Sequence, residues 1–228
     1  GRGSTVVRRI NRLCAELDKT EFYHMRANAY MEKARLVAVL GYESEVIPNL
    51  RYALAAATRS GKLIIEDQLR LELVDRLLDL AYLDEANDHL DKLRHERSEG
   101  LWDAHPIMFH LQFFKRESRL ARLGGEGSDA LTHIEQAKVF GDQHPSIYAK
   151  AEIASEKAQA YACLGQFGAA ETYFQRAEAF LNSINAISVT DATVNLLLHY
   201  ARMGEPERGL EIVSELSTSG AQLDEESL

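Results

Sequence analysis

A helix–turn–helix phrase recurs five times along this chain of 228 residues, and this recurrence constrains the fold more than any other feature. Each copy has a helical stretch, a small turn residue, and a second helical stretch with a small residue a few positions in. The turn residues are Gly41, Ala81, Gly125, Gly165 and Gly204, at intervals of 40, 44, 40 and 39 residues. A period of this length is typical of stacked helical hairpins, in which each hairpin buries its apolar face only against its neighbours.

The fourth copy, AQAYACLGQFGAAETYFQRA at residues 158–177, shows the pattern best. Ala170, Phe174 and Ala177 follow one another at helical spacing, so they share one face of the second helix. Gly165 suits a helix end that needs a left-handed residue. The small residues let the paired helices approach closely, which predicts a packed hairpin.

We therefore predict an all-α fold of eleven helices. Pro106 and Pro145 are expected at the first position of a helix, where proline is favoured. Ser44 is expected to cap a helix, and Pro48 to leave a small irregularity in it. The expected helices cover residues 5–18, 22–40, 44–58, 64–80, 83–96, 106–123, 127–140, 145–164, 167–182, 187–203 and 206–217.

The repeat resembles that of the tetratricopeptide repeat (TPR) family. The fourth copy carries the resemblance through Ala158, Tyr161, Gly165, Phe167, Ala170, Phe174 and Ala177. The fifth copy has Gly209 where the family has alanine, and the period near 40 exceeds the usual length of about 34. The resemblance covers roughly residues 22–217. It implies a right-handed α-solenoid of about five TPR-like hairpins plus an N-terminal helix.

The long repeats are similar to those of bacterial signalling proteins, including peptide-responsive regulators, large transcriptional activators and repeat domains attached to cyclic-dinucleotide synthases. In that setting the chain would be a regulatory or sensor domain of a larger protein. We expect residues 1–4 to be a cloning remnant, residues 5–217 the repeat domain, and residues 218–228 a tail or truncated linker.

The charge balance restricts the partners. The net charge of −9 argues against direct contact with nucleic acid and against an anionic membrane surface. Two cysteines far apart in the sequence are typical of a reduced, cytoplasmic protein, and no stretch is apolar enough to span a bilayer. We expect a cytoplasmic module.

The resemblance also implies where a ligand would bind, because such arrays hold extended segments or helices in a concave groove lined by the first helix of each hairpin. Amides there can pair with the backbone of an extended ligand. The alternative is a hydrated groove that binds nothing in particular. Carried over by register, the groove residues are Asn28, Arg35, Gln68, Asp75, Gln112, Lys115, Arg119, Arg122, Gln159 and Asn195.

Lys115, Arg119 and Arg122 form a basic stripe on one helix of this acidic chain. They could grip a carboxylate-bearing partner, but pairing with acidic residues of adjacent repeats is the favoured interpretation. A Lys/Asn clamp for chaperone tails is missing, since Asp75 stands where the second copy would need a cation.

An aromatic cluster of Trp102, Met108, Phe109, Phe113 and Phe114 is expected to be core, with Trp102 capping the seam or partly exposed. The eight histidines lack metal-ligand spacing, and no phosphate loop, nucleophile elbow or dinucleotide fingerprint occurs. We expect no cofactor, no metal and no catalytic site within this chain.

The sequence thus predicts a module that binds a protein or peptide ligand in the concave groove. The alternative is a self-associating scaffold, with a homodimer formed through Leu210, Ile212, Val213 and Leu216.

Overall fold

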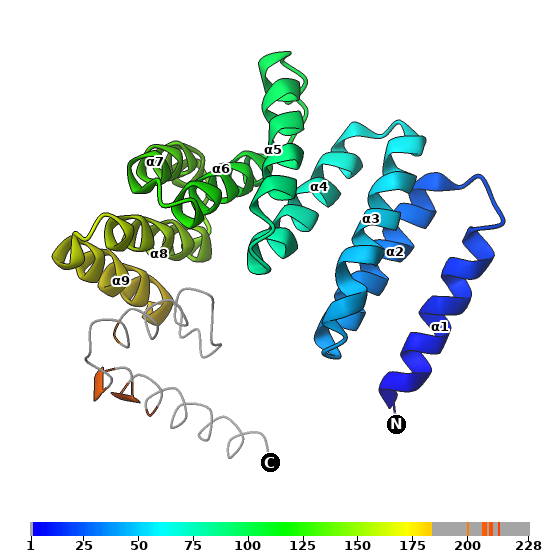
Figure 1. The fold of residues 1–228 in the computed structure, drawn as a ribbon, viewed down its shortest axis with the longest axis horizontal. Coiled ribbons are helices and arrows are strands. Elements are labelled where there is room, and N and C mark those ends of the chain that lie inside the picture. The colour runs from blue at the N-terminus through cyan, green and yellow to red at the C-terminus, as the bar shows by residue number, and fades with distance from the viewer. Residues whose placement is uncertain (1, 184–199, 201–206, 209, 212–213, 215–228) are drawn as a thin grey trace. The chain divides into compact units, whose positions relative to one another are not determined.

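The protein is described by a computed structural model over residues 2–183, 200, 207–208, 210–211 and 214. Over residues 2–183 the chain forms nine helices, and none of the described residues lies in a strand. Figure 1 shows them in chain order. They are α1 Arg2–Leu17, α2 Tyr23–Val39, α3 Glu43–Ser60, α4 Leu63–Asp79, α5 Leu83–Ser98, α6 Ile107–Leu123, α7 Gly127–Gln143, α8 Ile147–Cys163 and α9 Phe167–Asn182.

The helices confirm the all-α prediction, and the first nine expected ranges each correspond to one of them. The predicted hairpin at 187–203 and 206–217 lies almost wholly outside the described residues. The chain divides into two compact units, Gly1–Phe109 and His110–Leu228, and each is described by itself.

In unit 1, α2 packs on α3, α3 on α4, and α4 on α5, while α1 packs on α2. The core of this unit consists of small and aliphatic residues at helical spacing. Ala34 and Val37 of α2, and Leu50 and Ala53 of α3, are almost completely buried. Alanines at such positions let two helices approach closely, as the sequence predicts.

In unit 2, α8 packs on α7 and on α9. Ala158 of α8 clusters with Ala170 and Phe174 of α9, and Tyr200 joins them. Ala170 is fully buried between the paired helices, which confirms its predicted place. The aromatic residues assigned to the core are buried too, Trp102 and Phe109 within unit 1, and Phe113 and Phe114 within unit 2.

The turns confirm the left-handed helix ends. Gly41, Ala81, Gly125 and Gly165 have φ angles of 78°, 58°, 86° and 71°. Each donates its amide to the carbonyl three residues earlier, and the next amide donates to the carbonyl five residues earlier. This pair of bonds satisfies carbonyls that the helix end would otherwise leave open. Gly204 lies outside the described residues.

Three predictions about helix starts are wrong. α3 begins at Glu43 after Tyr42, so Ser44 lies inside the first turn. α6 begins at Ile107, directly after Pro106. α8 begins at Ile147, because the Ser146 side chain accepts a hydrogen bond from the Ala149 amide and so becomes the cap, with Pro145 before it. α3 continues through Pro48.

Candidate functional site

Polar side chains occupy equivalent positions on successive first helices. Asn28, Gln68, Gln112 and Glu152 each lie thirteen residues before the turn residue of their hairpin. In unit 1, Asn28 of α2 and Gln68 of α4 are exposed, and neither side chain has a hydrogen bond among the described residues. Two free amides therefore stand at the same register on neighbouring hairpins.

An ion pair bridges the same two helices. Arg35 of α2 donates from Nε and from a terminal nitrogen to the two carboxylate oxygens of Glu72 on α4, at 3.0 and 2.8 Å. A bidentate pair of this geometry is more specific than a single contact. The hydrogen bond to Glu72, supported by its charge, raises the pKa of Arg35 against the opposing effect of burial. Asp75 lies half-buried on α4, one turn after Glu72.

In unit 2 the basic stripe on α6 pairs with the next first helix. Lys115 lies 2.8 Å from Glu152 of α8, and Arg122 lies 3.9 Å from Glu156. Arg119, which stands between Lys115 and Arg122 in the sequence, is half-buried. For Lys115 and Arg122 this confirms the favoured interpretation, pairing with acidic residues of the adjacent repeat.

The other groove residues of unit 2 are also partly buried. Arg116 donates to the side-chain oxygen of Gln112, which leaves that amide engaged within its own helix. On α8, Gln159 Nε2 and Ser155 Oγ are buried and find no hydrogen-bond partner in the described part of the chain. A buried polar group without a partner costs free energy, so α8 carries two polar atoms that its own fold does not satisfy. Asn195 lies outside the described residues.

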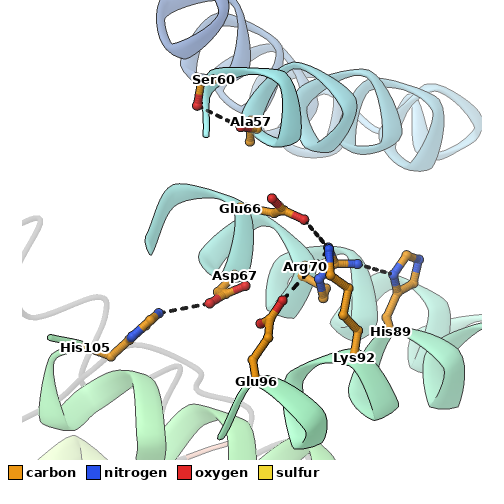
Figure 2. Close-up of polar contacts among 9 residues, drawn as sticks. All are labelled: Ala57, Ser60, Glu66, Asp67, Arg70, His89, Lys92, Glu96 and His105. Atoms are coloured by element: carbon orange, nitrogen blue, oxygen red, sulfur yellow. Dashed lines mark hydrogen bonds and ion pairs between the residues drawn. The ribbon is translucent and has the colours of Figure 1, made fainter. Parts of the chain in front are cut away.

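The structure also contains a buried charged cluster in unit 1 that the sequence analysis does not predict (Figure 2). Arg70 and Lys92 each lie 2.5 Å from the same oxygen of Glu66. Lys92 lies 3.8 Å from Glu96, and Arg70 contacts His89 Nδ1 at 3.2 Å. Two cations thus face two carboxylates across α4 and α5. Glu66, Arg70 and Glu96 are buried and Lys92 is partly exposed, so the pairing offsets the cost of burying the first three.

The pKa values of the cluster follow from burial and pairing. Burial works to raise the pKa of Glu66, but the hydrogen bond and charge of Lys92 outweigh it, and the pKa is lowered. Burial, followed by the charge of Arg70, lowers the pKa of His89. Burial, with a hydrogen bond to Glu96, raises the pKa of Asp67 to about 8.

Asp67 Oδ2 lies 3.1 Å from His105 Nε2, and their side chains are 0% and 1% exposed. An acid and a histidine in contact are a common catalytic pair, but a substrate cannot reach atoms that water does not touch. The pair instead fastens the segment before α6 onto α4. The cluster is therefore structural in this arrangement.

Part of this cluster carried a signal in the sequence. Glu66, Asp67 and Arg70 are charged residues in a helix that is otherwise rich in leucine, and charge on a buried face indicates pairing. The partner His105 carries no such signal, because it lies 38 residues away in the chain. Among the described residues no group of three or more His, Cys, Asp or Glu side chains could hold a metal, and no helix is long and apolar enough for a membrane span.

Comparisons with known proteins address the fold. No family model matches the chain, and no curated protein does. Among solved structures, a kinesin light chain with nearly identical TPR-like repeats from Podosopora anserina matches with a TM-score of 0.62 and 19% identity, over 81% of this chain and 89% of that chain. A Rap protein complexed with Competence and Sporulation Factor matches with a TM-score of 0.73 and 15% identity, over 95% of this chain and 60% of that chain.

The chain has the fold of a tetratricopeptide-repeat protein. BtubC from P. vanneervenii matches over 98% of this chain with a TM-score of 0.61 and 13% identity. At these identities the likeness concerns the fold, since the TPR signature residues are packing residues that many functions share.

Proposed function

We propose that this TPR module binds an extended polypeptide segment across the faces of its first helices. The observation that carries the proposal is the pair of exposed, unbonded amides of Asn28 and Gln68 at equivalent positions of α2 and α4. A side-chain amide offers both a donor and an acceptor, so it can pair with the N–H and C=O of one ligand residue. Regular spacing of such amides suits a backbone, which is itself regular.

The distances are compatible with this role. An extended chain advances about 3.3 Å per residue, so a segment of a few residues can reach from one first helix to the next. The Arg35–Glu72 ion pair supports the same geometry, because it links α2 and α4 next to the amides.

The comparison with the Rap protein supports the choice of ligand. That protein was solved in complex with Competence and Sporulation Factor, and the structural match to it covers 95% of this chain. With the repeat period near 40, this supports the finer proposal of a cytoplasmic regulatory or sensor domain in a bacterial signalling protein, either a transcriptional regulator or a cyclic-dinucleotide synthase. Ligand binding would then bias an output by favouring one conformation of the array.

The test uses a random peptide library displayed on phage and panned against the immobilised full chain. The recovered peptide is labelled, and its affinity is measured by fluorescence anisotropy. We expect Asn28→Ala with Gln68→Ala to weaken binding by at least about tenfold, since two hydrogen-bond pairs are lost. Gln136→Ala is the matched control, because Gln136 is an exposed, unbonded amide on the second helix α7.

Equal affinity of the double variant and the control would refute the amide assignment. A parallel Arg119→Glu, Gln159→Ala variant tests the unit 2 residues, and loss of binding only there would move the site to α6 and α8.

Self-association is the second candidate function, favoured by Leu210, which is exposed among the described residues of the last predicted hairpin. Ile212, Val213 and Leu216 lie outside the described residues. Sedimentation equilibrium distinguishes the two functions: a concentration-dependent dimer that Leu210→Glu dissolves supports the scaffold, and a monomer of unchanged mass at high concentration contradicts it.

A further inference from the structure

Helix α1 has the register of a second helix of a hairpin. In the four described hairpins, the residues five, nine and twelve positions after the turn residue are buried. These are Val46, Leu50 and Ala53 in α3; Ala86, Leu90 and Leu93 in α5; Ala130, Ile134 and Ala137 in α7; and Ala170, Phe174 and Ala177 in α9. The residues 40 positions before Val46, Leu50 and Ala53 are Val6, Ile10 and Leu13 of α1.

In a complete hairpin these positions face the first helix of the same hairpin. Ala170 and Phe174 cluster with Ala158 of α8, and Ala177 clusters with Ala151 of α8. The apolar residues at these positions are thus the ones that a first helix covers.

In α1, helix α2 covers one side of the apolar stripe, and Ile10 is half-buried against that side. Cys14 and Leu17 are buried against Ala29 of α2, and α1 stands at the edge of unit 1 beside α2 (Figure 1). Val6 and Leu13 are 48% and 47% exposed. They lie two helical turns apart on one face, so together they form an uncovered apolar strip.

The charges beside these positions indicate what the strip would accept. In two complete hairpins a group at one of these flanking positions meets an acid of its own first helix. His133, eight positions after its turn residue, lies 3.8 Å from Glu117, and Lys92, eleven positions after its turn residue, lies 2.5 Å from Glu66. The equivalent residues of α1 are Arg9 and Arg12. Both are exposed and have no ion pair among the described residues.

We propose that the exposed strip of α1, Val6 and Leu13 flanked by Arg9 and Arg12, binds an amphipathic helix with acidic flanks from a partner protein. The bound helix takes the place that a first helix has in the other hairpins. A second copy of α1 does not fit, because α1 carries four arginines against one glutamate and two such helices would repel each other. This surface is separate from the amides of α2 and α4, so it is tested independently of the proposed function.

The probe is a labelled peptide of residues 146–162, which keeps the small residues that α8 packs against α9. The acidic form carries Lys150→Glu and Lys157→Glu, and the basic form carries Glu152→Lys and Glu156→Lys. Binding of each to the full chain is measured by fluorescence anisotropy at low and high salt. We expect the acidic peptide to bind about tenfold tighter or more at low salt, with the difference shrinking at high salt.

Variants of the full chain locate the contact. Leu13→Glu should weaken binding of the acidic peptide at least about tenfold, because the peptide would bury the new charge. Arg9→Glu with Arg12→Glu should reverse the preference towards the basic peptide. Val139→Glu, at an exposed apolar residue of α7, is the control and should leave both affinities unchanged.

Three outcomes would overturn the proposal. The two peptides could bind equally, neither Leu13→Glu nor Val6→Glu could change the affinity for the acidic peptide, or sedimentation equilibrium could show a dimer that Leu13→Glu dissolves. The last would show that a second copy covers the strip. Circular dichroism of each variant verifies that the helices are retained.

Discussion

Replacing Ala81 with glycine is expected to stabilise this protein, although it removes a methyl group. Ala81 has a φ of 58° at the turn between α4 and α5, and it is the only non-glycine residue with a positive φ among the described residues. The left-handed conformation costs an L-residue roughly 1–2 kcal/mol, because Cβ approaches the following carbonyl oxygen. Glycine has no Cβ and adopts this conformation without that cost.

The magnitude follows from two opposing terms. Glycine relieves the strain of roughly 1–2 kcal/mol but gives the unfolded chain more freedom, which costs about 0.4–1 kcal/mol. The expected net gain is about 0.5–1 kcal/mol. The reverse substitutions, Gly41→Ala and Gly165→Ala, should destabilise by a similar amount. A Cβ at either glycine would meet no atom within 4 Å, so only the backbone term acts there.

The assay is urea denaturation followed by circular dichroism at 222 nm, with each variant measured against the parent chain. A shift of 1 kcal/mol corresponds to roughly 2–4 °C in Tm for a chain of this size, so thermal scans give a second reading. The reasoning fails if Ala81→Gly lowers the free energy of unfolding, or if Gly41→Ala and Gly165→Ala leave it unchanged.

Three further predictions use the same assay. Ala170→Leu should destabilise by about 1–3 kcal/mol through overpacking between α8 and α9, and an unchanged Tm would contradict the buried position of Ala170. Because the pKa of Asp67 is raised to about 8, the folded chain holds a proton that the unfolded chain loses above pH 4. The free energy of unfolding should then fall between pH 4 and pH 8, by at most about 1.4 kcal/mol per pH unit, and Asp67→Asn should flatten this slope. Parallel pH profiles of the parent chain and Asp67→Asn would argue against the raised pKa of Asp67. Ser155→Ala removes a buried hydroxyl without a described partner and should be neutral or stabilising by up to about 1 kcal/mol, whereas a loss of more than that would mean the hydroxyl is paired.

The fold follows from the sequence because its determinants are local. A helix, a residue that accepts a left-handed φ and a second helix repeat within about 40 residues, so periodicity and turn chemistry locate nine helices. The errors are local as well. Ser146 caps α8 through the Ala149 amide, and this hydrogen bond outweighs the preference of Pro145 for the first helical position.

The site is only partly accessible to such reasoning. Register places Asn28 and Gln68 on equivalent faces, but whether a charge is free depends on residues far away in the chain. Arg35 pairs with Glu32 on its own helix and also with Glu72, 37 residues later, and nothing near Arg35 predicts the second partner. The pairing of Asp67 with His105 likewise becomes visible only when the helices are packed.

In unit 1 the positions that pack and the positions proposed to face a ligand are separate. Packing uses residues five, nine and twelve after the turn, which are buried without exception, whereas the amides of unit 1 stand thirteen residues before it and are exposed. A substitution at Asn28 or Gln68 therefore removes no buried apolar area and costs the fold little. This separation lets the surface acquire different ligands on one scaffold, and it is the physical reason why the repeat signature predicts the fold of this chain while the ligand must be found by measuring binding.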